Sequence, residues 1–134
     1  MQILKATVES LENNYSAYIE GLDGVVATGK TISEIKTNIL NALDEYVKTC
    51  RELSCQIPEC LQGEYQVEFM MDVKSLLALY YGIFTKSGLE RLTGINQKQL
   101  WHYANGRSKP RRAQILKIEQ GLHRLGSELL SLHL

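Results

Sequence analysis

The chain has 134 residues, the length of one domain or two small ones, with 44% hydrophobic and 22% charged residues and a formal net charge of zero. This composition excludes a disordered, a collagen-like and a coiled-coil chain. No apolar run approaches the roughly 18 residues of a membrane span, and Met1-Gln2-Ile3-Leu4-Lys5 lacks the layout of a signal peptide. We therefore expect a cytoplasmic protein with no membrane partner.

The zero net charge conceals two halves of opposite charge. Residues 1–71 carry five Lys and Arg against eleven Asp and Glu, a net of −6, whereas residues 72–134 carry ten against four, a net of +6. A basic half suits a polyanion, and an acidic half suits a basic protein. This asymmetry predicts two modules, 1–71 and 72–134, with different partners; the alternative is a chance distribution of solvated charge.

The acidic half predicts a meander of three strands followed by a helix and a fourth strand. Alternation between turn residues places strands at 3–8, 15–19, 25–28 and, near the end of this half, 65–71. Thr31 and Glu34 form a capping box, in which Thr31 accepts from the amide of Glu34 and Glu34 from the amide of Thr31. Apolar residues at spacings of three and four then predict a helix over 32–51. The order β-β-β-α-β favours an α+β layer with one helix packed on one sheet.

The pattern Gly24-x4-Gly29-x-Thr31-x-x-Glu34-x-x-x-Asn38-x-x-x-Ala42 resembles the core of HicB-type antitoxins. The resemblance implies a partial RNase H-like fold and a small basic partner, an mRNA-cleaving toxin of the HicA type. The chain departs from the family in having Glu20-Gly21 and Val25 where the family usually places Pro-Asp or Pro-Glu and Cys. Two acidic residues near the first glycine are the candidate toxin-contacting side chains: Glu20 and Asp23.

An RNase H-like fold raises the alternative of a nuclease. Such chemistry needs several carboxylates converging on paired metal ions, whereas Asp44 and Glu45 are adjacent on the predicted helix and point apart. The cysteines, at C-x4-C-x4-C from Cys50 to Cys60, do not have a usual zinc spacing and are expected to be free thiols. We expect neither enzymatic activity nor a metal or cofactor.

The basic half predicts four helices. Apolar spacing places the first over 73–83 and the last over 111–125, with a short extension at 127–132. Between them, Thr85 is expected to cap a second helix that ends at Gly94. Asn96 is expected to cap a third, with Leu100 and Tyr103 facing inward and a left-handed residue at Gly106.

The pattern Leu89-x4-Gly94-Ile95-Asn96-x3-Leu100-x2-Tyr103-x-Asn105-Gly106-Arg107-x2-Pro110 resembles the helix-turn-helix of Xre/Cro-type repressors. The resemblance implies an all-α domain that binds double-stranded operator DNA. One position departs, because the class prefers a small residue where this chain has Glu90. Either the crossing of the two helices is shifted, or Gly88 supplies the space.

The third helix would present its N-terminal side chains to the major groove. The candidate base-reading residues are Gln97, Lys98, Gln99 and His102, since Gln pairs with adenine and Lys with guanine acceptors. The candidate phosphate-binding residues follow that helix: Arg107, Lys109, Arg111 and Arg112. Trp101 has two interpretations, packing on the domain or stacking against sugar and phosphate.

Together these features favour an antitoxin with a toxin-binding module and a DNA-binding module that represses its own operon. Repressors of this class act as pairs on DNA half-sites, so we expect a homodimer or homotetramer. The edge strands and the segment 125–134 are candidate assembly surfaces. The alternative is a stand-alone transcriptional regulator whose N-terminal module oligomerises or senses a ligand.

Overall fold

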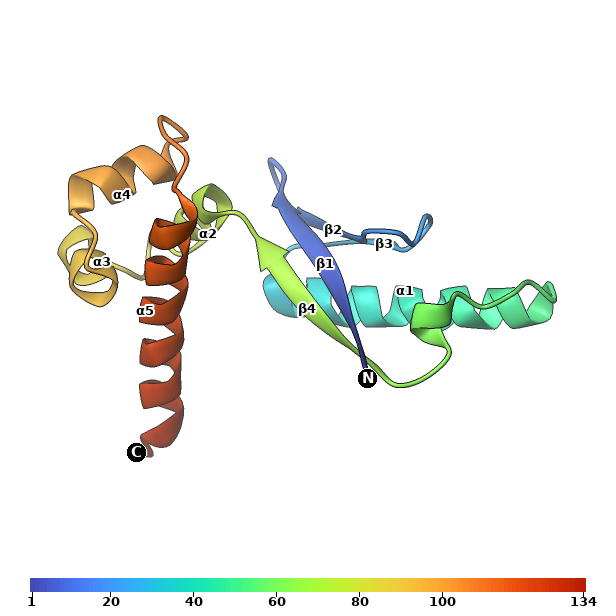
Figure 1. Ribbon diagram of the computed structural model, residues 1–134. Helices are drawn as coiled ribbons and strands as arrows, with labels where there is room; N and C mark the ends of the chain where they lie inside the picture. The colour runs from blue at the N-terminus through green and yellow to red at the C-terminus, as the bar shows by residue number, and fades with distance from the viewer. The chain divides into compact units, whose positions relative to one another are not determined.

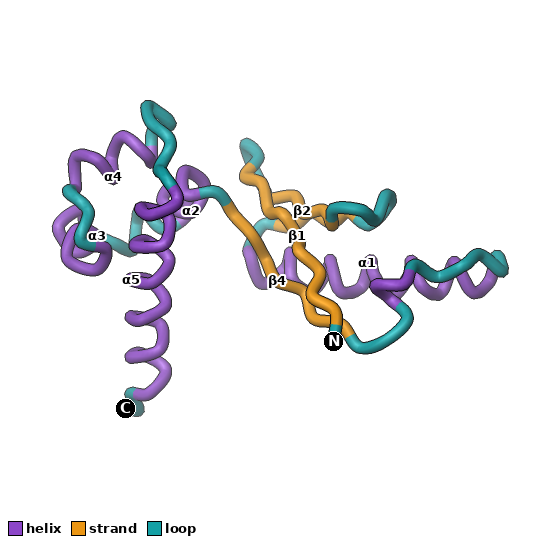
Figure 2. Tube along the Cα trace, in the orientation of Figure 1, coloured by secondary structure: helices purple, strands orange, loops and turns teal.

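A four-stranded sheet and five α-helices make up the computed structural model, which describes residues 1–134 (Figure 1). The chain divides into two compact units, Met1–Met71 and Asp72–Leu134. All strands belong to the first unit and four of the helices to the second, as the colouring of Figure 2 shows. The α+β class predicted from the sequence is confirmed.

The sheet of the first unit has the strand order β3-β2-β1-β4. Its strands are β1 (Gln2–Ser10), β2 (Tyr15–Ile19), β3 (Val26–Gly29) and β4 (Tyr65–Met71). The first three form the predicted antiparallel meander, whereas β4 lies parallel to β1. Parallel neighbours need a crossover, and here it consists of α1 (Ile32–Glu52) and a 3-10 turn, η1 (Glu59–Leu61).

The core of this unit lies between one face of the sheet and α1. Alternate residues of β1, Leu4, Ala6 and Val8, are buried, because successive side chains of a strand point to opposite faces. The helix adds residues four apart that are fully buried: Ile35, Ile39 and Leu43. The third strand begins one residue later than predicted, since Val25 is buried in the preceding turn rather than paired in the sheet.

Residues of the family pattern hold the junction between β3 and α1. The Thr31 hydroxyl accepts from the Glu34 amide at 3.1 Å, and the Asn38 side chain donates to the Thr28 carbonyl at 2.7 Å. The second half of the predicted capping box is wrong, because Glu34 accepts from the amide of Lys30 at 2.8 Å rather than from that of Thr31. The chain passes close to the helix at Gly29, where a Cβ would lie 3.0 Å from the Glu34 Cβ. The Glu34 carboxylate thus binds the amide of the residue before the N-cap, Lys30, and not the amide of the N-cap residue itself.

The second unit consists of α2 (Val73–Leu79), α3 (Lys86–Thr93), α4 (Gln97–Ala104) and α5 (Arg112–Ser131). Its core contains Leu77, Ile95, Leu100, Tyr103 and Ile118. The first helix ends at Leu79 and not at Ile83 as predicted; a series of turns follows, and Tyr80 there contacts Phe84. The last helix is longer than predicted and includes the extension.

Local signals determine where α3 and α4 begin and end. The Thr85 hydroxyl accepts from the Gly88 amide at 3.0 Å, and the Asn96 side chain from the Lys98 amide at 2.8 Å. Gly94 and Gly106 follow the two helices with φ of 73° and 71°, the left-handed region that glycine adopts without steric cost. These four predictions are confirmed.

A glycine on α5 determines how that helix crosses α3. A Cβ on Gly121 would lie 2.4 Å from the Leu92 carbonyl oxygen, so only glycine allows the two helices to approach this closely. The same carbonyl accepts from the Arg124 guanidinium at 2.9 Å. Gly88 does not make room for α4 at the crossing of the two helices. A Cβ at this position would meet only the Thr85 hydroxyl and no atom of α4. Glu90 instead accepts from the Gln97 side chain at 3.1 Å.

Candidate functional site

The first turn of α4 carries two candidate base-reading residues with different surroundings. The Lys98 side chain is exposed, while its amide completes the Asn96 cap. Gln97 is half-buried, and its amide nitrogen is held by Glu90, which leaves its oxygen free to accept. Lys98 is thus available to a ligand as it stands, whereas Gln97 is restrained in one orientation.

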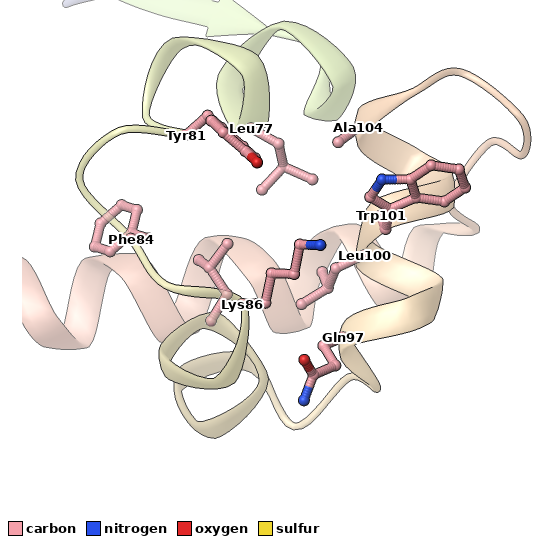
Figure 3. Close-up of a pocket in the computed structure, with 9 residues that line it drawn as sticks. Leu77, Tyr81, Phe84, Lys86, Gln97, Leu100, Trp101 and Ala104 are labelled. Atoms are coloured by element: carbon pink, nitrogen blue, oxygen red, sulfur yellow. The ribbon is translucent and has the colours of Figure 1, made fainter.

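A hollow opens beside these residues, between α2, α3 and α4. Its inner, apolar part of about 40 Å³ is lined by Leu77, Leu89 and Leu100, and Figure 3 shows the Lys86 side chain extending into it. An outer part of about 260 Å³ is lined by Lys86, Gln97, Lys98 and Trp101. The hollow therefore has an apolar floor and two lysines at its mouth.

Gln99 contacts the segment that follows α4. It is half-buried, and its side-chain nitrogen donates to the Ser108 hydroxyl at 3.1 Å. This bond ties α4 to the segment that leads into α5. The periodicity of an eight-residue helix alone did not show this contact, because its partner lies nine residues away, beyond the end of the helix.

His102 and Trp101 form an aromatic pair on the outer side of α4, with ring centroids 5.4 Å apart. The Trp101 indole is 37% exposed, and the guanidinium of Arg107 lies 4.6 Å from its centroid. The Arg107 amide donates to the His102 carbonyl at 2.9 Å. The segment after α4 therefore folds back on the helix and brings Arg107 over the indole.

Four exposed cations lie in the six-residue stretch 107–112 after α4: Arg107, Lys109, Arg111 and Arg112. The structure adds two that the sequence reasoning missed. Lys74 on α2 lies against this segment, since its amine would be 3.2 Å from a Cβ on Gly106. Lys86 is the first residue of α3 and lines the hollow. The predicted cap at Thr85 could have identified it from the sequence, because the cap places Lys86 at the start of this helix.

The candidate acidic residues of the first unit, Glu20 and Asp23, are exposed on the turn between β2 and β3. Gly21 and Gly24 adopt φ of 86° and 91° there, and the buried Leu22 anchors the turn. Burial raises the pKa of the Tyr46 phenol on α1, and the Cys50 thiol and the Asp23 carboxylate raise it further. The charge of Asp23 thus acts on a side chain of α1.

Residues 2–58 match the UPF0150-like family. This is the family of the HicB-like antitoxins, and the matched segment runs from β1 through α1. It covers less than half of the chain and includes the acidic turn. No curated protein and no solved structure matches the chain.

The matched segment ends between Cys55 and Cys60. Cys50 is buried, Cys55 is exposed and Cys60 is half-buried, and all three are free thiols. The structure brings no three His, Cys, Asp or Glu side chains together as a metal-binding group. None of the helices combines the length and the apolar character needed to cross a membrane.

Proposed function

We propose that this protein is an antitoxin that binds and neutralises a small basic toxin, an mRNA-cleaving ribonuclease of the HicA type, and represses its own operon by binding DNA. The observation that carries this proposal is the match of residues 2–58 to the HicB-like family, followed by a helical unit of net charge +6. The protein acts by binding and carries out no catalysis of its own.

The first unit supplies the acidic surface for the toxin. Its net charge of −6 would attract a basic partner over a distance of about one Debye length, roughly 8–10 Å at cellular salt. Glu20 and Asp23 lie on a turn that two positive-φ glycines shape and a buried leucine anchors. Charged groups on an anchored turn lose little entropy on binding, which favours this turn over the exposed Asp44 and Glu45 of α1.

The second unit supplies the DNA contacts as a helix-turn-helix, whose two helices are α3 and α4. The first unit, which precedes it in the chain, has a partial RNase H-like fold. The first turn of α4 would enter the major groove, where Lys98 reaches guanine acceptors and Gln97 accepts from the exocyclic amine of adenine or cytosine. The cations after α4, with Lys74 and Lys86, would bind phosphates. His102 lies one turn further along the same helix.

Two copies would occupy one operator, because a single domain of this size makes too few contacts for specific binding at cellular salt. Paired half-sites lie roughly 34–36 Å apart. The end of α5 offers a surface for pairing, since its leucines are exposed: Leu129, Leu130 and Leu132. A homodimer, or a homotetramer built from two of them, follows from this arrangement.

Co-purification tests the proposal. The untagged chain is expressed beside the neighbouring small open reading frame, whose product carries a tag, and we expect both to elute together and the neighbour to be toxic when expressed alone. Glu20→Lys with Asp23→Lys should release the partner. The matched pair Glu9→Lys with Glu12→Lys, exposed residues at the end of β1 and in the turn that follows it, should not. No complex, but specific binding to the upstream DNA, would identify a stand-alone regulator instead.

A further inference from the structure

Trp101 is the one tryptophan of the chain, and it lies at the surface of α4 rather than in the core. A large aromatic side chain is usually buried or placed at an interface. Here the indole lines the outer part of the hollow together with Lys86 and Lys98. Lysines therefore lie on one side of the indole and a guanidinium lies over its ring.

The backbone brings Arg107 to this ring. Gly106 adopts a φ of 71°, which turns the chain back toward α4, and the Arg107 amide then donates to the His102 carbonyl. The Gln99 side chain holds the same segment through Ser108. Arg107 is thus anchored on both sides along the chain, whereas Lys109, Arg111 and Arg112, which are exposed like Arg107, have no aromatic ring against them.

Stacking prepares a guanidinium for binding. The electron-rich face of an indole attracts the cation but leaves the edge N–H groups of the guanidinium free. Those N–H groups form a planar fork that matches two phosphate oxygens. Because the stacked side chain has already lost much of its rotational freedom, it loses less on binding than a solvated cation does.

We propose that Trp101 is a positioning residue for DNA binding: its indole holds Arg107 so that the guanidinium grips one backbone phosphate at the C-terminal end of α4. A phosphate fits better than a base, because Arg107 lies beyond the end of this helix, away from the base-reading first turn. Arg107 then contributes more to affinity than the neighbouring cations do. This inference rests on the proposed DNA binding of the second unit.

A double-mutant cycle with the full-length chain tests the inference. The probes are duplexes that tile the DNA directly upstream of the gene, and electrophoretic shifts report binding in every variant. We expect Arg107→Ala to weaken binding about tenfold in the wild-type chain but only about twofold in the Trp101→Ala chain, as for a lost charged contact. Trp101→Phe, which keeps a weaker aromatic face, should give an intermediate result. Thermal unfolding of each variant, followed by circular dichroism, checks that it is folded.

Lys109→Ala provides the matched comparison, because this cation has no aromatic partner. Its effect should be the same with and without the indole. Equal effects of Arg107→Ala in both backgrounds, or unchanged binding by Trp101→Ala, would overturn the inference while leaving the proposed DNA binding intact. Failure of the wild-type chain to bind any upstream duplex would instead overturn the proposed DNA binding, and the inference with it.

Discussion

The two units differ in how closely their sequence patterns lie to their candidate sites. In the first unit, the pattern residues Gly29, Thr31, Glu34 and Asn38 hold the β3–α1 junction, and the candidate acidic residues lie on another turn. In the second unit, the pattern residues Leu100 and Tyr103 are buried, and the candidate base-reading residues lie on the same helix, at positions that the pattern leaves unspecified. A motif can therefore identify a fold without marking the surface that binds.

This comparison predicts that each unit can be disrupted separately. Ile39→Ala removes a fully buried side chain from the first unit and should lower its free energy of unfolding by about 2–5 kcal/mol. We expect toxin binding to be lost while the second unit keeps its helical signals in NMR spectra. Leu40→Ala, an exposed neighbour on α1, is the control. Joint loss of both units would show that they do not fold independently.

The reciprocal test uses the helix crossing in the second unit. Gly121→Ala places a methyl group against the Leu92 carbonyl and should cost about 1–3 kcal/mol through the displacement of α5. Gly126→Ala on the same helix meets no atom within 4 Å and should be neutral or slightly stabilising, since alanine favours helix. Chemical denaturation measures both variants. Equal stabilities would contradict the close crossing.

Base reading by α4 predicts a loss confined to one position of the operator. Lys98→Ala should cost about 1–3 kcal/mol at a single base pair and leave the affinity for other sites nearly unchanged. The measurement is a titration against operator variants that each carry one substituted base pair. If the variant discriminates among them as the wild-type chain does, Lys98 does not read a base.

The helix cap of the first unit should have a smaller effect. Thr31→Ala removes the acceptor for the Glu34 amide and should lower stability by about 1 kcal/mol. Thr37→Ala, an exposed residue within the same helix, removes a hydroxyl without removing a cap and serves as the control. Thermal unfolding distinguishes them, and an equal shift in both variants would argue against the cap.

The smallest expected effect concerns the phosphate contacts. Arg112 is exposed at the start of α5, and Arg112→Ala should weaken binding to all duplexes about equally. It should also reduce the slope of log affinity against log salt by roughly one unit. Binding isotherms at several salt concentrations measure both quantities. A loss that depends on sequence would instead place Arg112 at a base.

The sequence alone was enough to predict most of the local features of the chain. The caps at Thr31, Thr85 and Asn96, the helix end at Gly94 and the left-handed residue at Gly106 all agree with the structure. Each depends on atoms within a few residues along the chain, and the type of residue limits the backbone conformations and hydrogen bonds available to it. The periodicities of two and 3.6 residues likewise placed the strands and most of the helices.

Only the tertiary structure decided the contacts between distant residues. The parallel pairing of β1 with β4, the crossing of α5 over α3 at Gly121, and the position of Lys74 beside Gly106 join segments that periodicity treats separately. The Trp101–Arg107 stack spans only six residues, yet it too depends on how the chain turns after α4. Such contacts follow from packing the whole core at once, because many separate side chains together determine where each segment can lie. The sequence thus determined which side chains are available, and the packed fold decided which of them meet.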